Sequence, residues 1–128
     1  MMFKGIYNKI TGQCGEDIAA DLLKKKGCKI VQRNFKCKTG EIDIIAKDKE
    51  NLIFVEVKTR RSDKFGTPAE AVTYNKKQNI VKTAKMYLLK NPTDLNIRFD
   101  IIEVYGCFDG ESFNLEGTNH FEQVFWEV

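Results

Sequence analysis

The hydrophobic positions of the chain fall into six stretches, and their spacing predicts a mixture of helices and strands. Apolar residues recur at helical spacing from Gly12 to Lys26, and again in a second helix that ends at about Leu89. Short apolar or alternating runs predict four strands, at residues 28–37, 40–46, 52–58 and 98–105. The predicted order is helix, three strands, helix, strand, which is typical of an α/β domain.

Polar and helix-breaking residues mark the connections between these elements. The polar segment 47–51 predicts a hairpin, which sets the second and third strands side by side. Asn75, with Gln78 three residues later, predicts a cap, so that 68–74 forms a separate turn. Asn91-Pro92 ends the second helix, and the fourth strand is then reached through a helical crossover.

Two neighbouring strands carry acidic residues where a buried strand is normally apolar. Asp43 lies in the second strand and Glu56 in the third, with Lys58 two residues later on the same face as Glu56. Burying even a neutral polar group without a partner costs about 2 kcal/mol or more, and a charge costs more still. We therefore expect Asp43 and Glu56 to converge on one cation, with Lys58 beside them.

These side chains suit the metal-dependent hydrolysis of a phosphodiester. Carboxylate oxygens are preferred ligands of Mg²⁺ or Mn²⁺, and Mg²⁺ keeps waters, one of which can attack the phosphate. A lysine such as Lys58 can hold the scissile phosphate or help to deprotonate that water. One acid and one base at a strand end are a weak signal alone, because such pairs are common and usually solvated.

Glu16 is a further acidic candidate, on the first helix. It lies three, four and seven positions before Ala19, Ala20 and Leu23, so it projects along the packed face of that helix. An acid near the start of a helix can simply interact favourably with the helix dipole. Glu16 is therefore either such a residue or a member of the site.

Charge is distributed unevenly along the chain. Residues 1–90 contain 20 Lys and Arg against 10 Asp and Glu, whereas residues 91–128 contain 1 against 8. The basic part includes the candidate site, and such a skew suits a polyanion such as nucleic acid. For Arg60, Arg61 and Lys64 we favour phosphate contact over simple solvation.

Length and composition indicate one domain over residues 1–128, with 106–128 as a C-terminal extension of the core. The 128-residue chain is 42% hydrophobic and 30% charged, which is ordinary for a globular protein. No apolar run suits a signal peptide or a membrane span, so we expect a cytoplasmic protein without a membrane partner. The aromatic residues of the extension, Phe121, Phe125 and Trp126, could cover the core or a homodimer contact.

Five short motifs occur in the order and spacing of a known family. They are Gly15-Glu16-Asp17-Ile18-Ala19, Arg33-Asn34-Phe35, Gly40-Glu41-Ile42-Asp43, Phe54-Val55-Glu56-Val57-Lys58-Thr59-Arg60 and Phe65-Gly66-Thr67-Pro68. In this pattern the chain resembles the YraN-like family of small bacterial proteins, which is placed in the PD-(D/E)xK nuclease superfamily. It also resembles the archaeal Holliday-junction resolvases in its arrangement of acids.

The resemblance implies a restriction-endonuclease-like core of order αβββαβ, with a central mixed sheet flanked by helices. It implies that the carbonyl of Val57 joins Asp43 and Glu56 as a metal ligand, and that Glu16 reaches the site from outside the sheet. Lys76 matches a basic position of the family that could touch the phosphate backbone, although solvation is an equal alternative. The implied activity is cleavage of DNA in preference to RNA, for example at branched structures. The alternative is a weakly catalytic binding or assembly module that acts with a repair or RNA-processing partner.

Overall fold

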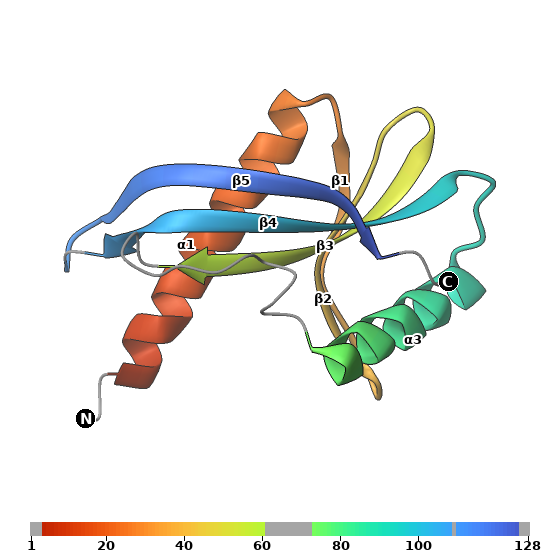
Figure 1. The fold of residues 1–128 in the computed structure, drawn as a ribbon, viewed down its shortest axis with the longest axis horizontal. Helices are drawn as coiled ribbons and strands as arrows, with labels where there is room; N and C mark the ends of the chain where they lie inside the picture. The colour runs from red at the N-terminus through yellow and green to blue at the C-terminus, as the bar shows by residue number, and fades with distance from the viewer. Residues whose placement is uncertain (1–3, 61–72, 109, 126–128) are drawn as a thin grey trace.

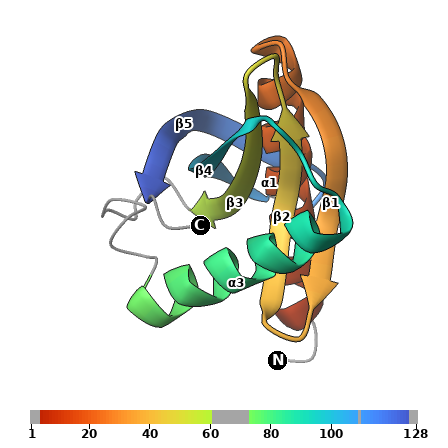
Figure 2. The ribbon, with the colours of Figure 1, turned by 90° about the vertical axis from the view of Figure 1, so that its right-hand side faces the viewer.

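The computed structural model describes residues 4–60, 73–108 and 110–125, and in these ranges two helices cover a five-stranded sheet (Figure 1). The elements in chain order are α1 (Lys4–Lys25), β1 (Lys29–Cys37), β2 (Gly40–Lys47), β3 (Asn51–Arg60), α3 (Tyr74–Lys90), β4 (Asn96–Phe108) and β5 (Phe113–Phe125). The two helices lie on opposite faces of the sheet (Figure 2). Neither of these helices in the described ranges is long and apolar enough to cross a membrane.

The sheet is mixed, with the spatial order β1-β2-β3-β4-β5. β1 with β2, β2 with β3, and β4 with β5 are antiparallel, whereas β3 and β4 are parallel. The helix α3 lies between those two parallel strands in the sequence, as a crossover connection requires. The predicted α/β class, with a mixed sheet flanked by helices, is confirmed. The arrangement is consistent with a restriction-endonuclease-like fold.

The sequence-based expectation of a short aromatic tail after β4 was incomplete. Residues 113–125 form a thirteen-residue strand, β5, that pairs with β4 along the edge of the sheet. The segment mixes polar and apolar residues without clean alternation, because an edge strand has only one neighbour and much of it faces solvent. The register of β5 also shifts opposite Phe99 and Ile101, which further disturbs the alternation of polar and apolar residues.

The start of α3 differs from the predicted cap. Thr73, not Asn75, is the N-cap residue: its backbone is extended, and its hydroxyl oxygen accepts the backbone N–H of Lys76 at 3.2 Å. The helix ends as expected, with the backbone N–H of Asn91 donating to the carbonyl of Tyr87 at 2.9 Å. The prediction placed the cap two residues late because Asn and Thr are both good N-cap residues.

The core consists of two apolar layers, one on each face of the sheet. On the face that α3 covers, Phe54 stacks on Phe99 with ring centroids 5.5 Å apart, and Tyr87 of α3 packs edge-on against Phe54. On the face that α1 covers, the apolar members are Ala19, Ala20, Leu23, Ile44, Ala46, Ile53, Val55, Ile102 and Val104. Each fully buried Ile, Leu or Phe contributes about 1.5–3 kcal/mol, so these layers fix both helices on the sheet.

The α3 face changes character along β3 and β4. Phe54 on β3 and Phe99 and Ile101 on β4 belong to the apolar layer. The next positions on the same face are Glu56 and Lys58 on β3 and Glu103 on β4. Lys58 and Glu103 are partners in the parallel register. The polar end of this face therefore holds charged groups from two adjacent strands.

Candidate active site

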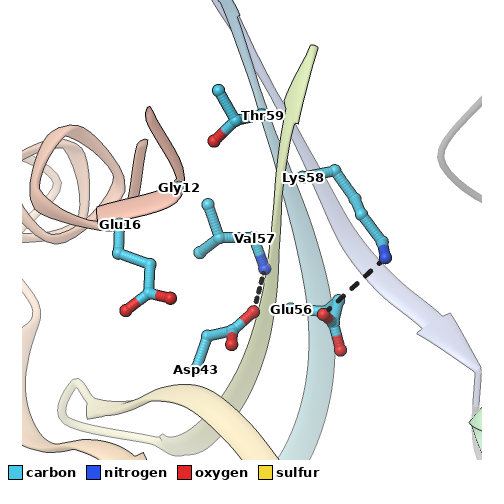
Figure 3. A pocket seen from close by; sticks show the side chains of 7 residues that line it. All are labelled: Gly12, Glu16, Asp43, Glu56, Val57, Lys58 and Thr59. Carbon is cyan, nitrogen blue, oxygen red and sulfur yellow. Dashed lines mark hydrogen bonds and ion pairs between the residues drawn. The ribbon is translucent and has the colours of Figure 1, made fainter. Parts of the chain in front are cut away.

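The candidate site lies where β2 separates from β3. The two strands pair from Lys47↔Leu52 to Ile44↔Val55. The next residue of β2, Asp43, uses its side chain instead: its Oδ2 accepts the backbone N–H of Val57 at 2.8 Å (Figure 3). A hydrogen bond to this carboxylate thus takes the place of a backbone hydrogen bond between β2 and β3. The N–H and C=O of one residue point to the same side of a strand, so the carbonyl of Val57 faces the same opening.

A break in the alternation of β2 turns Asp43 into this opening. Ile42 packs in the layer under α3, whereas Ile44 packs in the layer under α1. Residues two apart in a regular strand would share one face. The strand therefore changes face at Asp43, which carries the carboxylate to the edge of β3.

The opening forms a pocket of about 340 Å³. It is lined by Gly12, Glu16, Asp43, Glu56, Val57, Lys58 and Thr59. Glu56 and Lys58 come from one face of β3, and Val57 and Thr59 come from the other, so the pocket wraps around the strand edge (Figure 3). The four side chains predicted to share a site, Glu16, Asp43, Glu56 and Lys58, all line this pocket. Their chemical roles stay predictions.

Of the two central carboxylates, Asp43 is poorly compensated. Burial, followed by the negative charge of Glu56, raises the pKa of the Asp43 carboxyl to about 8. The backbone N–H of Val57 acts in the opposite direction but does not outweigh these effects. The side chain of Glu56 is only 12% exposed. The hydrogen bond from Val57 therefore does not compensate the charged form of Asp43.

Two lysines approach Glu56 from different elements. Nζ of Lys58 lies 3.9 Å from Oε1 of Glu56, and Nζ of Lys76, on the first turn of α3, lies 3.4 Å from the same oxygen. Burial, and then the hydrogen bond with Lys76, lower the pKa of the Lys58 ammonium. Burial also lowers the pKa of Lys76, but its hydrogen bond with Lys58 and the charge of Glu56 outweigh this and raise it. Lys58 is thus the lysine of this pair that gives up a proton more readily.

Glu16 approaches the pocket from α1, across the opening from Glu56 (Figure 3). A Cβ on residue 15 would collide with Oγ1 of Thr59, so Gly15 is what allows α1 to lie this close to β3. Burial raises the pKa of Glu16, against the opposing charge of Arg33, whose Nη2 lies 3.6 Å from Oε1 of Glu16. Glu16 is therefore held at the rim of the pocket by local packing, whichever role it has.

The predicted nucleic-acid contacts are only partly within the described chain. Nε of Arg60 lies 3.1 Å from Oε2 of Glu103, a carboxylate that is 1% exposed and also accepts the hydroxyl of Tyr105 at 2.5 Å. Arg60 is therefore tied to the sheet, while Arg61 and Lys64 lie outside the described residues. Sequence reasoning missed Glu103; the only signal was an acid within the strongly apolar run of the fourth strand.

A metal at this pocket would have few protein ligands. Among the described residues, no group of three or more His, Cys, Asp or Glu side chains lies close enough to hold an ion. The available oxygens are the carboxylates of Asp43 and Glu56 and the carbonyl of Val57, so water would complete the coordination. Mg²⁺ often binds proteins in this way, through one or two carboxylates and several waters.

Fold and pocket together define an α/β protein of restriction-endonuclease-like architecture, with an acidic and basic pocket at the edge of its central strand. Residues 15–104 match the uncharacterised protein family UPF0102. The chain belongs to this family. The resemblance to the YraN-like proteins is thereby confirmed.

Two relatives in this family match almost end to end. A UPF0102 protein of Caldanaerobacter subterraneus subsp. tengcongensis is 50% identical over 123 residues, which cover 95% of this chain and 99% of that protein. A UPF0102 protein of Clostridium acetobutylicum is 49% identical over 118 residues, covering 91% and 97%. Among solved structures, the chain is similar to SfsA of Pyrococcus furiosus in complex with Ca²⁺, with a TM-score of 0.43 and 14% identity. That match covers 87% of this chain but only 63% of the SfsA chain.

Proposed function

We propose that this protein is a metal-dependent nuclease that hydrolyses phosphodiester bonds, in DNA in preference to RNA. The observation that carries the proposal is the meeting of Asp43 and Glu56 in one pocket with Lys58. Burial and the negative charge of Glu56 disfavour the charged form of Asp43 and raise its pKa. Strongly perturbed acids in a cleft are characteristic of functional sites.

The donor set fits a hard divalent cation. Asp43, Glu56 and the carbonyl of Val57 offer oxygen ligands, which suit Mg²⁺ or Mn²⁺ and not a softer ion. The raised pKa of Asp43 supports the same assignment, because a bound cation would favour the charged form of this carboxyl. When bound, the ion would lower the pKa of a coordinated water and stabilise charge that develops on the phosphate.

The remaining groups would position substrate and proton. Lys58 lies beside Glu56, where its ammonium can hold the scissile phosphate. Alternatively, its lowered pKa makes the neutral amine easier to form, and only that form can accept a proton from the attacking water. Glu16 faces the pocket from α1 and would orient water or cation from the opposite side.

The basic character of the site region supports a polyanionic substrate. Lys76 is half-exposed at the start of α3, and its side chain reaches the pocket. Arg61 and Lys64 follow directly after β3 in the sequence, and we assign them phosphate contacts together with Lys76. Arg60 is the weakest member of this set, because Glu103 already engages its guanidinium.

A second candidate function is a nucleic-acid-binding or assembly module without efficient turnover. The observation in its favour is that Glu56 already pairs with Lys58 and Lys76, so that two ammonium groups balance its charge without any metal. Such a pocket could hold a phosphate and not cleave it. A partner protein of DNA repair or RNA processing would then supply the activity.

The test is a cleavage assay on labelled single-stranded, duplex, flap and four-way DNA, with RNA versions of each, in Mg²⁺, in Mn²⁺ and in chelator. Wild type should cleave only with metal, and Glu56→Gln should not cleave although it still binds. Glu50→Gln, at an exposed position of the β2–β3 turn, is the matched control and should behave as wild type. Equal trace rates for wild type and Glu56→Gln would mean contamination, and the binding module would then replace the nuclease.

A further inference from the structure

Asn34 has a backbone conformation that is unusual for a residue in a strand. Its φ is +54°, in the left-handed region that most residues with a side chain avoid and that Asn tolerates. In the β1–β2 ladder Arg33 pairs with Ile44 and Phe35 pairs with Ile42, so Asn34 lies opposite Asp43. The unusual residue therefore sits directly across from the central acid of the pocket.

Both strands change face at this register position. Arg33 contacts acids of α1, whereas Phe35 packs in the layer under α3. The same change occurs in β2, with Asp43 at the break. The left-handed turn at Asn34 is thus the counterpart, in β1, of the irregularity that brings Asp43 into the pocket.

The side chain of Asn34 bridges two carboxylates from different elements. With its amide nitrogen facing them, it donates to Oε1 of Glu16 at 3.2 Å and to Oε1 of Glu41 at 2.9 Å. The opposite orientation would place the amide oxygen against two acceptors, so the hydrogen-bond network selects this one. Asn34 links the acid of α1 to the strand that carries Asp43.

Arg33 is a further partner of Glu16, at 3.6 Å, but its guanidinium is shared with Asp17, which lies 2.7 Å away. Glu41 and Glu16 carry like charges, which would push the two side chains apart without a donor between them. Two N–H groups on one rigid amide satisfy both carboxylates at once.

We propose that Asn34 is a positioning residue of the pocket: its left-handed backbone places the amide between Glu16 and Glu41, and this holds the Glu16 carboxylate toward Asp43. The inference rests on the proposed function for its catalytic consequence, because Glu16 matters to cleavage only if the pocket is an active site. The contact of the Asn34 amide with Glu16 and Glu41 rests on the geometry alone.

Two substitutions separate the backbone role from the side-chain role. Asn34→Gly keeps the left-handed backbone without strain but removes the amide. Asn34→Asp also tolerates this conformation and has the same shape, but it turns a donor into a third carboxylate. Gln32→Glu, on an exposed residue of the same strand, is the control for added negative charge and should leave cleavage unchanged.

If the amide positions Glu16, Asn34→Asp should lower kcat by about a hundredfold with little change in KM, since a displaced group near the chemistry costs this much. Asn34→Gly should give a smaller loss. In a Glu16→Gln background, Asn34→Asp should have almost no further effect, because both substitutions act through one residue. Wild-type rates for both Asn34 variants, or an equal loss with and without Glu16, would overturn the inference.

A second readout needs no substrate. Asn34→Asp should lower the urea midpoint of wild type, because three carboxylates then face one another, and Glu16→Gln should recover part of that loss. If the shifts in urea midpoint for the two single variants simply add in the double variant, Asn34 and Glu16 do not interact, and the proposed role of Asn34 is overturned. A wild type that cleaves nothing would contradict only the proposed function. The urea measurements on the single and double variants would still report on the contact between Asn34 and Glu16.

Discussion

Two aspartates on the same sheet, one buried and one half-buried, have opposite environments. Asp100, on β4, is 1% exposed. Its carboxylate accepts two hydrogen bonds from the guanidinium of Arg98, at 2.9 and 3.0 Å. It also accepts one from Nε2 of His120 at 2.7 Å and one from the backbone N–H of Gln123 at 3.1 Å. Burial alone would raise the pKa of Asp100, but the bonds from His120 and Arg98 outweigh it, and the pKa is lowered. Asp43 has the backbone N–H of Val57 and a pKa raised to about 8.

We interpret this difference as one between a structural acid, Asp100, and a proposed metal ligand, Asp43. Asp100 joins β4 to β5 and is completed by groups of the protein itself, so its charge stabilises the fold. Asp43 lies at the edge of a pocket, beside a second acid, and lacks such partners. An acid in a cleft that the fold leaves uncompensated is a candidate for a functional role.

The largest expected effect is on cleavage in Asp43→Asn. The substitution removes a proposed metal ligand but keeps an oxygen that can accept the N–H of Val57, so we expect cleavage to fall at least about a hundredfold. The free energy of unfolding should not decrease, because repulsion with Glu56 disappears. Rates and urea unfolding measured on one preparation check both parts. A destabilised Asp43→Asn protein would place Asp43 in the same structural class as Asp100.

Asp100→Asn should show the reverse pattern. Removing this carboxylate leaves the guanidinium of Arg98 without its bidentate partner, and breaking a buried ion pair costs about 3 kcal/mol. Urea unfolding measures this loss. Cleavage per folded molecule should stay at the wild-type level, and a loss of cleavage without a loss of stability would remove the distinction between the two aspartates.

Much of this architecture follows from local patterns. The strands that carry Asp43 and Glu56 have the predicted positions within a few residues, and Glu56 and Lys58 share a face because a period of two requires it. The polar turn at 47–51 sets the two strands side by side, with Asp48 Oδ1 accepting the backbone N–H groups of Glu50 and Asn51 at 2.8 and 2.7 Å. Period and turn chemistry are properties of neighbouring residues, which a sequence displays directly.

The remaining features depend on contacts between distant residues. The change of face at Asp43 has no signature in an apolar strand, where residues on both faces are hydrophobic. The pairing of Lys76 with Glu56 depends on where α3 crosses the sheet, and that of Arg60 with Glu103 depends on the parallel register of β3 and β4. Tertiary packing decides all three, so local reasoning could name several of these residues but not their partners.

The two aspartates should also give opposite dependences of stability on pH. The folded-state pKa of Asp43, about 8, lies above its ordinary value of about 3.9, so the folded protein binds the extra proton between these values. Its contribution to stability is present below about pH 4 and is lost as the pH rises toward 8, by at most about 1.4 kcal/mol per pH unit. Asp100, with its lowered pKa, contributes stability above about pH 4 and loses it in acid.

Urea unfolding between pH 3 and pH 9 measures these slopes. The stability of wild type relative to Asp43→Asn should decrease steadily from pH 5 to pH 8. Relative to Asp100→Asn, the stability of wild type should decrease only in acid. A flat difference between wild type and Asp43→Asn would show that the Asp43 carboxyl titrates normally and is not short of a partner.

The smallest expected effect is stabilisation by a bound cation. The cation would compensate the Asp43 carboxylate, as Arg98 and His120 compensate the carboxylate of Asp100. At a free Mn²⁺ concentration of about three times Kd, the free energy of unfolding should rise by about 0.8 kcal/mol, because the ion binds only the folded state. Asp43→Asn and Glu56→Gln should lose this increment, whereas Asp100→Asn should keep it. Bound cation should also flatten the pH slope above pH 5, since a positive charge lowers the pKa of Asp43. An equal increment in Asp43→Asn would locate the ion elsewhere, and among the described residues Glu56 would then have only Lys58 and Lys76 as charged partners at the pocket.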